Sequence, residues 1–281
     1  MIKNIFFSLL LIAGLALTAC SSDDNSVEQT PKIYYMTVDA TKGVNEAASP
    51  AYRRALNLSG STLSASWATT EHVYVQGTLS SDGVTKFWFE GSIQPQTAGT
   101  TTRLNGAISL PIGWSGNVDD YVKYPYNFTL QFPRSGDLDY TGQIGTLADI
   151  AAKYDYAIAT DVLFDIENDH IVGTNSATFF NQQAIVKFTL KDKADGTTLL
   201  SPTALTIDNG LGDDYPLTLT IPASTYTTNG NGVLYVAIPG FSGQNVTLTA
   251  TCSSGTYNYT KSNVTFTNGN YYEISVKMTK Q

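Results

Sequence analysis

Apolar side chains recur at every second position in segment after segment of this 281-residue chain. Alternate side chains of a β-strand point to opposite faces, so this period of two predicts strands with one buried and one exposed face. Strands of that kind build antiparallel sheets that pack face to face as sandwiches. The sets expected to alternate are, in chain order, Tyr34, Met36, Val38 and Ala40; Val73 and Val75; Phe87 and Phe89; Phe128, Leu130 and Phe132; Ala184, Val186, Phe188 and Leu190; Leu217, Leu219 and Ile221; Leu234, Val236 and Ile238; and Tyr272, Ile274, Val276 and Met278.

Turn residues separate these segments. Asn, Asp and Gly tolerate positive φ at little steric cost, which suits tight connections between strands. The composition agrees, because 23 Gly, 17 Tyr and 12 Phe stand against only 14% charged residues. The turn sequences are Asp82-Gly83, Ser115-Gly116-Asn117, Asp195-Gly196, Asn209-Gly210, Asn229-Gly230-Asn231-Gly232 and Asn268-Gly269-Asn270.

One helix is expected, from Thr146 to Tyr154. Thr146 is a candidate N-cap with Asp149 three residues later, close to a capping box. Such a helix would carry one apolar stripe and pack over the end of a sheet. The stripe comprises Leu147, Ile150, Ala151 and Tyr154.

A polar, glycine-containing stretch from Asn168 to Ser176 divides the strand-rich sequence. We place a domain boundary there, with an N-terminal β-sandwich domain at residues 32–172 and a C-terminal one at residues 173–281. By size alone, roughly 250 ordered residues would fit one large or two ordinary β-domains.

The first residues have the pattern of an export signal. Lys3 supplies a positive charge, and residues 5–17 form an apolar run shorter than the about 20 residues that span a membrane as a helix. The run ends in Leu17-Thr18-Ala19-Cys20, which resembles the lipobox of bacterial lipoproteins. That resemblance implies removal of residues 1–19 and a lipid on the thiol of Cys20. The alternative is an ordinary secretory signal that happens to contain a cysteine.

Residues 20–31 form a polar, acidic tether. Its start is similar to the short acidic export signals that route Bacteroidetes lipoproteins to the cell exterior, although a plain solvated spacer would look the same. With Cys20 lipidated, Cys252 has no partner within the chain, so no internal disulfide is expected. Cys252 has the same parity as the apolar residues Val246, Leu248 and Ala250 before it, which favours a buried structural thiol.

Acidic residues outnumber basic ones by 24 to 16. The formal net charge of −8 becomes −9 once Lys3 leaves with the leader. A surface with this charge argues against nucleic acid or anionic lipid as a partner.

Residues that carry out catalysis or bind metals are sparse. His72 and His170 lie far apart, without Cys, Asp or His at zinc-ligand spacing, and no phosphate loop, nucleophile elbow or redox cysteine pair occurs. We therefore expect no enzyme activity, no metal and no cofactor. A glycosidase stays a third and weaker hypothesis, which would need two facing carboxyls about 5–10 Å apart.

Two further groups of residues have a plain and a functional interpretation. One is an acidic turn that superficially suggests calcium but lacks the residue order of a calcium loop, so a solvated turn is expected. The other is the tryptophans, which could stack on sugars but are scattered in a way that favours core or hairpin packing. The residues concerned are Asp208, Asp213 and Asp214 in the turn, and Trp67, Trp88 and Trp114.

Four motifs in order give the mature chain a family likeness. Together with the lipobox they resemble the fimbrillin-like proteins of Bacteroidales, over almost the whole mature length. The motifs are Arg53-Arg54-Ala55-Leu56-Asn57-Leu58-Ser59-Gly60-Ser61-Thr62-Leu63 followed by Ser66 to Val75; Tyr140-Thr141-Gly142-Gln143-Ile144-Gly145-Thr146-Leu147 with Tyr154-Asp155-Tyr156-Ala157; Ala177-Thr178-Phe179-Phe180-Asn181-Gln182-Gln183-Ala184-Ile185-Val186-Lys187-Phe188; and Gly269-Asn270-Tyr271-Tyr272-Glu273-Ile274-Ser275-Val276.

The resemblance implies two transthyretin-like antiparallel β-sandwich domains with one short helix, and a fimbrial role. In polymerising members an arginine-specific protease removes the first strand, and a strand of the next subunit takes its place. Here residues 33–42 would be that strand, and cleavage after Arg53 or Arg54 would release it together with the lipid. Alternatively, both arginines are ordinary loop residues. The strand at Tyr271 to Met278 could itself be a donor or could simply close its own sheet.

The leading hypothesis is therefore a surface lipoprotein that acts as a fimbrial structural subunit in adhesion. Its expected partners are other fimbrial subunits, the outer membrane through the lipid on Cys20, and a host or glycan receptor that the sequence does not identify. Its expected location is the outer membrane, at the cell surface or in a fimbrium. An anchor, accessory or non-polymerising role stays open. The alternative is a cell-surface glycan-binding lipoprotein.

Overall fold

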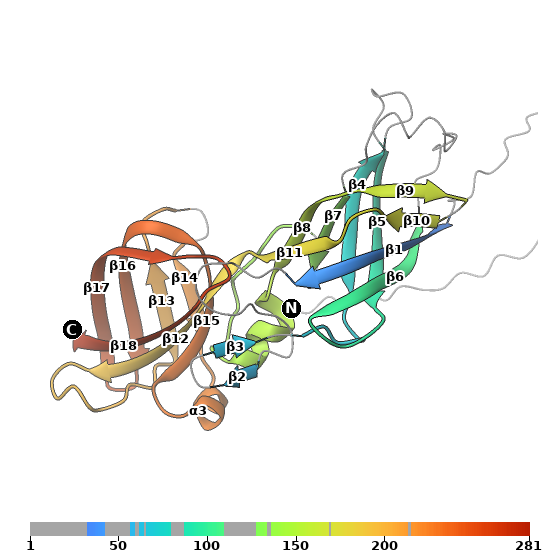
Figure 1. Ribbon diagram of the computed structural model, residues 1–281. Coiled ribbons are helices and arrows are strands. Elements are labelled where there is room, and N and C mark those ends of the chain that lie inside the picture. Colours follow the sequence, from blue (N-terminus) through green and yellow to red (C-terminus); the bar gives the residue numbers. More distant parts are fainter. Residues whose placement is uncertain are drawn as a thin grey trace, which may run out of the picture. The chain divides into compact units, whose positions relative to one another are not determined.

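Two large sheets account for most of the strands (Figure 1). The computed structural model describes residues 33–42, 57–59, 62–64, 66–79, 87–109, 128–133, 136–168, 170–212 and 215–281. The elements are β1 (Ile33–Lys42), β2 (Asn57–Ser59), β3 (Thr62–Ser64), β4 (Val73–Leu79), β5 (Phe87–Pro95), β6 (Thr101–Ser109), β7 (Phe128–Phe132), α2 (Leu147–Asp149), the π-helix η1 (Ile150–Tyr154), β8 (Ala157–Val162), β9 (Phe164–Glu167), β10 (His170–Gly173), β11 (Ala177–Asn181), β12 (Gln183–Asp192), β13 (Ala204–Asp208), β14 (Leu217–Thr220), α3 (Ala223–Asn229), β15 (Val233–Pro239), β16 (Phe241–Cys252), β17 (Gly255–Phe266) and β18 (Tyr271–Lys280). The all-β class expected from the alternation is confirmed.

The first sheet has nine strands in the order β11-β8-β7-β4-β5-β6-β1-β10-β9. One further pairing joins β11 to β1. The strands β1, β6, β5, β4, β7, β8 and β11 therefore form a closed ring of hydrogen-bonded neighbours, and β1 is the strand that closes it. Closing a sheet on itself removes the unpaired edges that an open sheet leaves at both ends.

The core of this first sheet is built by the alternating residues that the sequence predicts. Tyr34, Met36, Val38 and Ala40 of β1 are buried, and so are Val73 and Val75 of β4 and all three predicted residues of β7. Trp67 lies in this core with its indole ring 5.2 Å from the ring of Phe179 and 5.6 Å from that of Phe132. The remaining buried members are Ile93, Leu104, Ile108, Ala157, Ala159, Val162, Phe164, Ile171 and Ala177.

The second sheet has seven strands in the order β14-β13-β16-β17-β18-β12-β15. The predicted residues of β12, β14 and β15 are buried in its core, whereas Tyr272 and Ile274 of β18 are only partly buried. Strand β18 pairs with β12 over eight positions and with β17 over two. It therefore lies within its own sheet, between β17 and β12.

Parallel pairing is the main correction to the expected antiparallel sheets. Strand β1 runs parallel to β10 and to β11, and β12 runs parallel to β18. Parallel neighbours require a long connection between them, here more than 100 residues in the case of β1. A local period of two carries no information about such distant partners.

The predicted helix at residues 146–154 is present in an altered form. The Thr146 hydroxyl accepts a hydrogen bond from the Asp149 amide at 3.1 Å, as the cap motif predicts. After one turn of α-helix the chain continues as the π-helix η1, and Ile150 and Tyr154 join the core of the second sheet. A second helix, α3, was not predicted, because its segment Ala-Ser-Thr-Tyr-Thr-Thr-Asn is rich in Thr, a weak helix former.

The polar stretch that suggested a domain boundary contains structure of its own. Strands β9 and β10 form a hairpin within it, and β11 still belongs to the first sheet although it follows residue 172. The second sheet begins with Gln183 in β12. The division into domains at residues 32–172 and 173–281 stays a prediction.

Candidate functional site: the seat of the first strand

Strand β1, the blue arrow in Figure 1, has hydrogen-bonded neighbours on both edges. On one edge it pairs with β6 at nine consecutive positions, from Ile33 opposite Ser109 to Thr41 opposite Thr101. On the other edge its first half pairs with β10 and its last residues pair with β11. We use the word seat for the space that β1 fills between these three strands.

The inward face of β1 fills the core with side chains of decreasing size. Tyr34, Met36, Val38 and Ala40 are each no more than 2% exposed. Complete burial is worth roughly 1.5–3 kcal/mol for a side chain such as Met36 or Val38, and less for the single methyl group of Ala40. This series therefore anchors β1 and also sets its register, because a shift by one residue would place polar side chains in the core.

Gly173, at the end of β10, provides room for Val38. A Cβ atom on Gly173 would lie 2.6 Å from the Cγ2 atom of Val38, far below van der Waals contact. The two residues fit because one lacks a side chain where the other is branched. The seat is thus shaped around a β-branched residue at this position.

At the far end of the inward face the fit is between two small residues. Ala40 lies opposite Ala177 of β11, and both are buried. Two residues along β11, the ring of Phe179 packs edge-on against Trp67. Because this end is already filled by large aromatic side chains, it offers little volume for β1.

The outward face of β1 carries one ion pair. Asp39 lies directly opposite Arg103 of β6, and the Arg103 Nε atom donates to Asp39 Oδ1 at 2.9 Å. The Arg103 NH2 group donates to Asp39 Oδ2 at 3.4 Å, so the contact is two-pronged. These hydrogen bonds hold the pKa of the Asp39 carboxyl below its ordinary value.

Two other outward residues of β1, Ile33 and Tyr35, are apolar or aromatic, whereas Thr37 and Thr41 are polar. The ring of Tyr35 lies 5.9 Å from the ring of His170 on the neighbouring strand β10. Ile33, Tyr35 and Val172 are exposed. The outward face of this pair of strands therefore combines exposed apolar side chains with polar ones.

Three of the sequence-predicted site residues lie outside the described residues. These are Cys20, the expected lipid carrier, and Arg53 and Arg54, the candidate cleavage positions. In the sequence, Arg53 and Arg54 fall between the end of β1 and the start of β2. In the described part of the chain, no helix combines the length and apolarity that crossing a membrane requires.

His72, His170 and Asp208 of the acidic turn are exposed. His72 is exposed, and its ring nitrogens lie 3.0 Å from the Ser92 hydroxyl and 3.0 Å from the Gln94 amide nitrogen. Asp208 is exposed and accepts a hydrogen bond from the Gly210 amide, whereas Asp213 and Asp214 lie outside the described residues. Among the described residues no group of His, Cys, Asp and Glu could hold a metal ion.

The tryptophans and the free cysteine were expected to be structural. Trp67 is 1% exposed and belongs to the first core, which confirms core packing. The side chain of Trp88 and all of Trp114 lie outside what the structure describes. Cys252 is half-buried against the second core, and its burial raises the pKa of the thiol.

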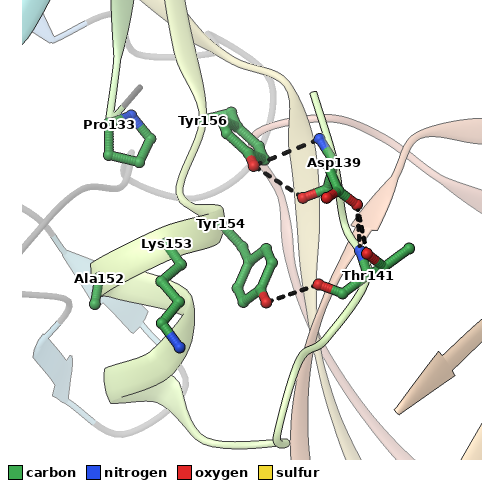
Figure 2. A pocket seen from close by; sticks show the side chains of 7 residues that line it. All are labelled: Pro133, Asp139, Thr141, Ala152, Lys153, Tyr154 and Tyr156. Carbon is green, nitrogen blue, oxygen red and sulfur yellow. Dashed lines mark hydrogen bonds between the residues drawn. The ribbon is translucent and has the colours of Figure 1, made fainter. Parts of the chain in front are cut away.

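A small pocket of about 220 Å³ lies beside the π-helix (Figure 2). Two tyrosine hydroxyls cross it: Tyr154 donates to the carbonyl of Thr141 at 2.7 Å, and Tyr156 donates to the carbonyl of Asp139 at 2.8 Å. Lys153 pairs with Asp149 at 3.0 Å, with Nζ facing Oδ1. The Tyr154 bond holds Thr141 against the helix, and the Tyr156 bond holds Asp139 against the chain that follows it, so both tyrosine hydroxyls are already engaged.

Sequence reasoning did not find the Asp39–Arg103 pair or the fit of Val38 to Gly173. Both contacts join residues far apart in the chain, 64 positions in the case of the ion pair. No local spacing marks either contact. A hint was available only in β1 itself, where Asp39 interrupts an otherwise uncharged run from Ile33 to Thr41.

Comparisons with known proteins identify fimbrial and adhesion proteins of Bacteroidales among the similar solved structures. A proposed cell adhesion protein from Bacteroides ovatus is 12% identical and has a TM-score of 0.42, with 90% of this chain and 96% of that chain covered. A fimbrial assembly protein from Parabacteroides distasonis is 11% identical at a TM-score of 0.40, with 87% and 91% covered. The tip fimbrial protein Mfa3 from Porphyromonas gingivalis is 10% identical at a TM-score of 0.40, with 88% and 95% covered.

No protein-family model matches this chain, and no curated protein matches it in sequence. The structural likenesses are distant in both identity and TM-score, so they carry no argument about function. What the chain does has to be argued from the seat of β1.

Proposed function

We propose that this chain is a fimbrial structural subunit, held at the bacterial cell surface through a lipid on Cys20, whose first strand is later replaced by a strand of another subunit. The observation that carries the proposal is the position of β1. It is the first described strand, it closes the ring of the first sheet, and it fills a core position with four alternating side chains.

The bonds that hold β1 are of a kind that another strand can reproduce. Its pairing with β6, β10 and β11 uses main-chain groups, which every residue except proline offers. Its specificity comes from alternate side chains in pockets, which is the logic of β-strand addition. An incoming strand would thus recover both the ladder and the buried apolar area.

The sequence around β1 supplies the means of release. Arg53 and Arg54 follow β1 and precede β2, so a cut at either one would separate β1 and everything before it from the rest of the chain. The lipid on Cys20 would leave with the same fragment. Cleavage would therefore convert an anchored precursor into a subunit with an open seat.

N-terminal sequencing of the protein recovered from assembled surface material tests this function. We expect the sequence to begin at Arg54 or Ala55, and we expect the double variant Arg53→Lys with Arg54→Lys to stay uncut and lipidated if the protease requires arginine. The variant Arg134→Lys serves as the control for changing an arginine elsewhere. Assembled protein that retains lipidated Cys20 would contradict the proposed processing.

The similar solved structures include a fimbrial assembly protein and a tip fimbrial protein, whose likeness to this chain is distant. We expect the subunit at the cell surface or within a fimbrium, in contact with other subunits. Its contribution would be mechanical association and adhesion.

A further inference from the structure

The ion pair of Asp39 with Arg103 lies at one defined position along the seat. Between Ile33 and Thr41 the charged residue of β1 is Asp39, and Arg103 is the charged residue of β6. The two lie directly opposite each other in the antiparallel ladder, with their side chains 60% and 62% exposed. When β1 leaves the seat, the carboxylate of Asp39 leaves with it, and Arg103 of β6 loses this partner.

The position of Arg103 would then influence which strand enters. Oppositely charged residues that face each other across two strands stabilise the pair, and like charges destabilise it. The Arg103 side chain extends from a regular strand, so its charge lies at one defined position along the seat. A carboxylate at that position would restore the two hydrogen bonds seen with Asp39.

The inward face adds a size requirement next to the charge. The residue after Asp39 is Ala40, which lies against Ala177 at the end of the core that Trp67 and Phe179 fill. The residue before it is Val38, which is shaped to Gly173. Overfilling a packed core forces side chains and backbone to shift, so larger residues are disfavoured here.

We infer that the seat selects a partner strand with a carboxylate opposite Arg103 and a small residue immediately after it. Read in the direction of β1, the accepted pattern has an aromatic residue, a long apolar residue two positions later and a β-branched residue two positions after that. An acidic residue and a small residue then follow in succession. This inference rests on the proposed function, since it names the chemistry of the strand that would replace β1.

The same argument excludes β18 of a second copy as the natural occupant. Aligning Tyr272, Ile274 and Val276 with Tyr34, Met36 and Val38 would place Lys277 opposite Arg103 and Met278 in the place of Ala40. Lys277 would repel Arg103, and Met278 would be too large for the space that Ala40 fills.

Placing β18 in a different register does not remove the misfit. The carboxylate of β18 on the outward parity is Glu273, and placing it opposite Arg103 would put Tyr272 at the Val38 position and Ile274 at the Ala40 position. Both residues are larger than those they would replace. The partner strand therefore belongs to a different subunit or to another segment.

Peptide exchange into the full-length protein tests the inference. A recognition site for a sequence-specific protease is placed within residues 43–50, the chain is cut under native conditions, and fluorescent peptides compete with β1 for the seat. The peptides are Ile33–Lys42 in its natural sequence, the same peptide with Asp39→Asn, Asp39→Lys or Ala40→Met, a Thr37→Ser control, and Tyr271–Lys280. Fluorescence anisotropy reports the fraction bound.

We expect the natural and Thr37→Ser peptides to bind equally. The Asp39→Asn peptide should bind about threefold more weakly, as for an exposed ion pair. The Asp39→Lys peptide should bind about tenfold more weakly because like charges then face each other. The Ala40→Met peptide should also lose about tenfold through overpacking, and Tyr271–Lys280 should not displace β1.

Exchanging the two charges distinguishes loss of the ion pair between positions 39 and 103 from a general loss of peptide affinity. In a protein carrying Arg103→Glu, the Asp39→Lys peptide should bind better than the natural one. Equal binding of the natural, Asp39→Lys and Ala40→Met peptides would overturn the selectivity while leaving strand replacement intact. Failure of every peptide, including the natural one, to enter the seat would overturn the proposed function and this inference with it.

Discussion

The side-chain amide of Gln143 pairs with the main chain of Ala237 as a neighbouring strand would. Its Nε2 atom donates to the Ala237 carbonyl at 2.8 Å, and its Oε1 atom accepts from the Ala237 amide at 2.8 Å. Two residues earlier in β15, the Tyr235 amide donates to the carbonyl of Gly145 at 2.9 Å. The segment around Gln143 therefore covers the edge of β15, which would otherwise be the open end of the second sheet.

Replacing Gln143 should weaken the fold measurably. In Gln143→Leu both polar groups of Ala237 lose their partners in a buried place, which costs about 2–4 kcal/mol in the free energy of unfolding. Chemical denaturation measures this change. The control is Gln96→Ala, an exposed residue whose amide contacts the Gln94 carbonyl at 3.3 Å, and it should stay within about 0.5 kcal/mol of the parent. Equal stabilities of the two variants would show that Gln143 does not protect the edge.

The contact between Gly173 and Val38 predicts a compensating pair of substitutions. Gly173→Ala should lower the free energy of unfolding by about 1–3 kcal/mol, because the new Cβ would meet Val38 at 2.6 Å. In a Val38→Ala background the same change should cost less, because the contact with Cγ2 is gone and the tightest one left is with Cβ of residue 38 at 3.0 Å. A double-mutant cycle measures this coupling. Additive effects would mean that the two side chains do not compete for space.

A disulfide across the seat should prevent release of β1. Thr37 and Asn105 are paired on adjacent antiparallel strands, where Cα atoms are about 4.5–5.5 Å apart, within the range that a disulfide spans. The variant Thr37→Cys with Asn105→Cys should keep β1 attached after cleavage at Arg53 or Arg54 when oxidised, and lose it when reduced. Electrophoresis with and without reductant reads the result, and Thr37→Cys alone is the control. Assembly that proceeds at the same rate with the disulfide intact would rule out replacement of β1.

Acid should loosen the turn after β12 only at low pH. The Thr198 hydroxyl and the amides of Thr198 and Thr197 hydrogen-bond to Asp195 and lower the pKa of its carboxyl to about 2. A folded pKa below the unfolded value means that this contribution to stability is complete above the ordinary pKa of 3.8 and is lost as the pH falls toward 2. Carboxyl titration by NMR measures the pKa. In Thr198→Ala it should rise toward the ordinary value, and an unchanged pKa would remove the hydroxyl as its main cause.

The sequence was most informative where a single local rule decides the structure. The alternation in β1, β7, β12 and β14 marked side chains that are in fact buried, because strand periodicity and burial coincide there. The Thr146 cap was also local, since its hydroxyl contacts an amide three residues away. In β12 and β15 the alternation understates the burial, because Ile185 and Ala237, which lie on the opposite parity, are buried as well.

Long-range relationships were out of reach of the sequence. The ring closure by β1 and β11, the parallel pairing of β12 with β18, and the ion pair of Asp39 with Arg103 each depend on which distant segments become neighbours. Helix α3 was missed for a different reason, because tertiary packing stabilises a segment of low helix propensity. The candidate site is built from long-range contacts, so the sequence predicted strand β1 but not the strands and side chains that it contacts.

The pairing of β1 with β11 also has a consequence for how the chain folds. The hydroxyls of Thr41 and Thr178 lie 3.4 Å apart although 137 residues separate them along the chain. Contacts of such high sequence separation form late and slowly, since the entropy of closing a long loop is lost before the contact stabilises anything. The ring can therefore close only after β11 has been synthesised, and until then the apolar face of β1 is not fully buried. A nascent chain of this design should depend on chaperones during folding more than a protein whose neighbouring strands follow one another directly.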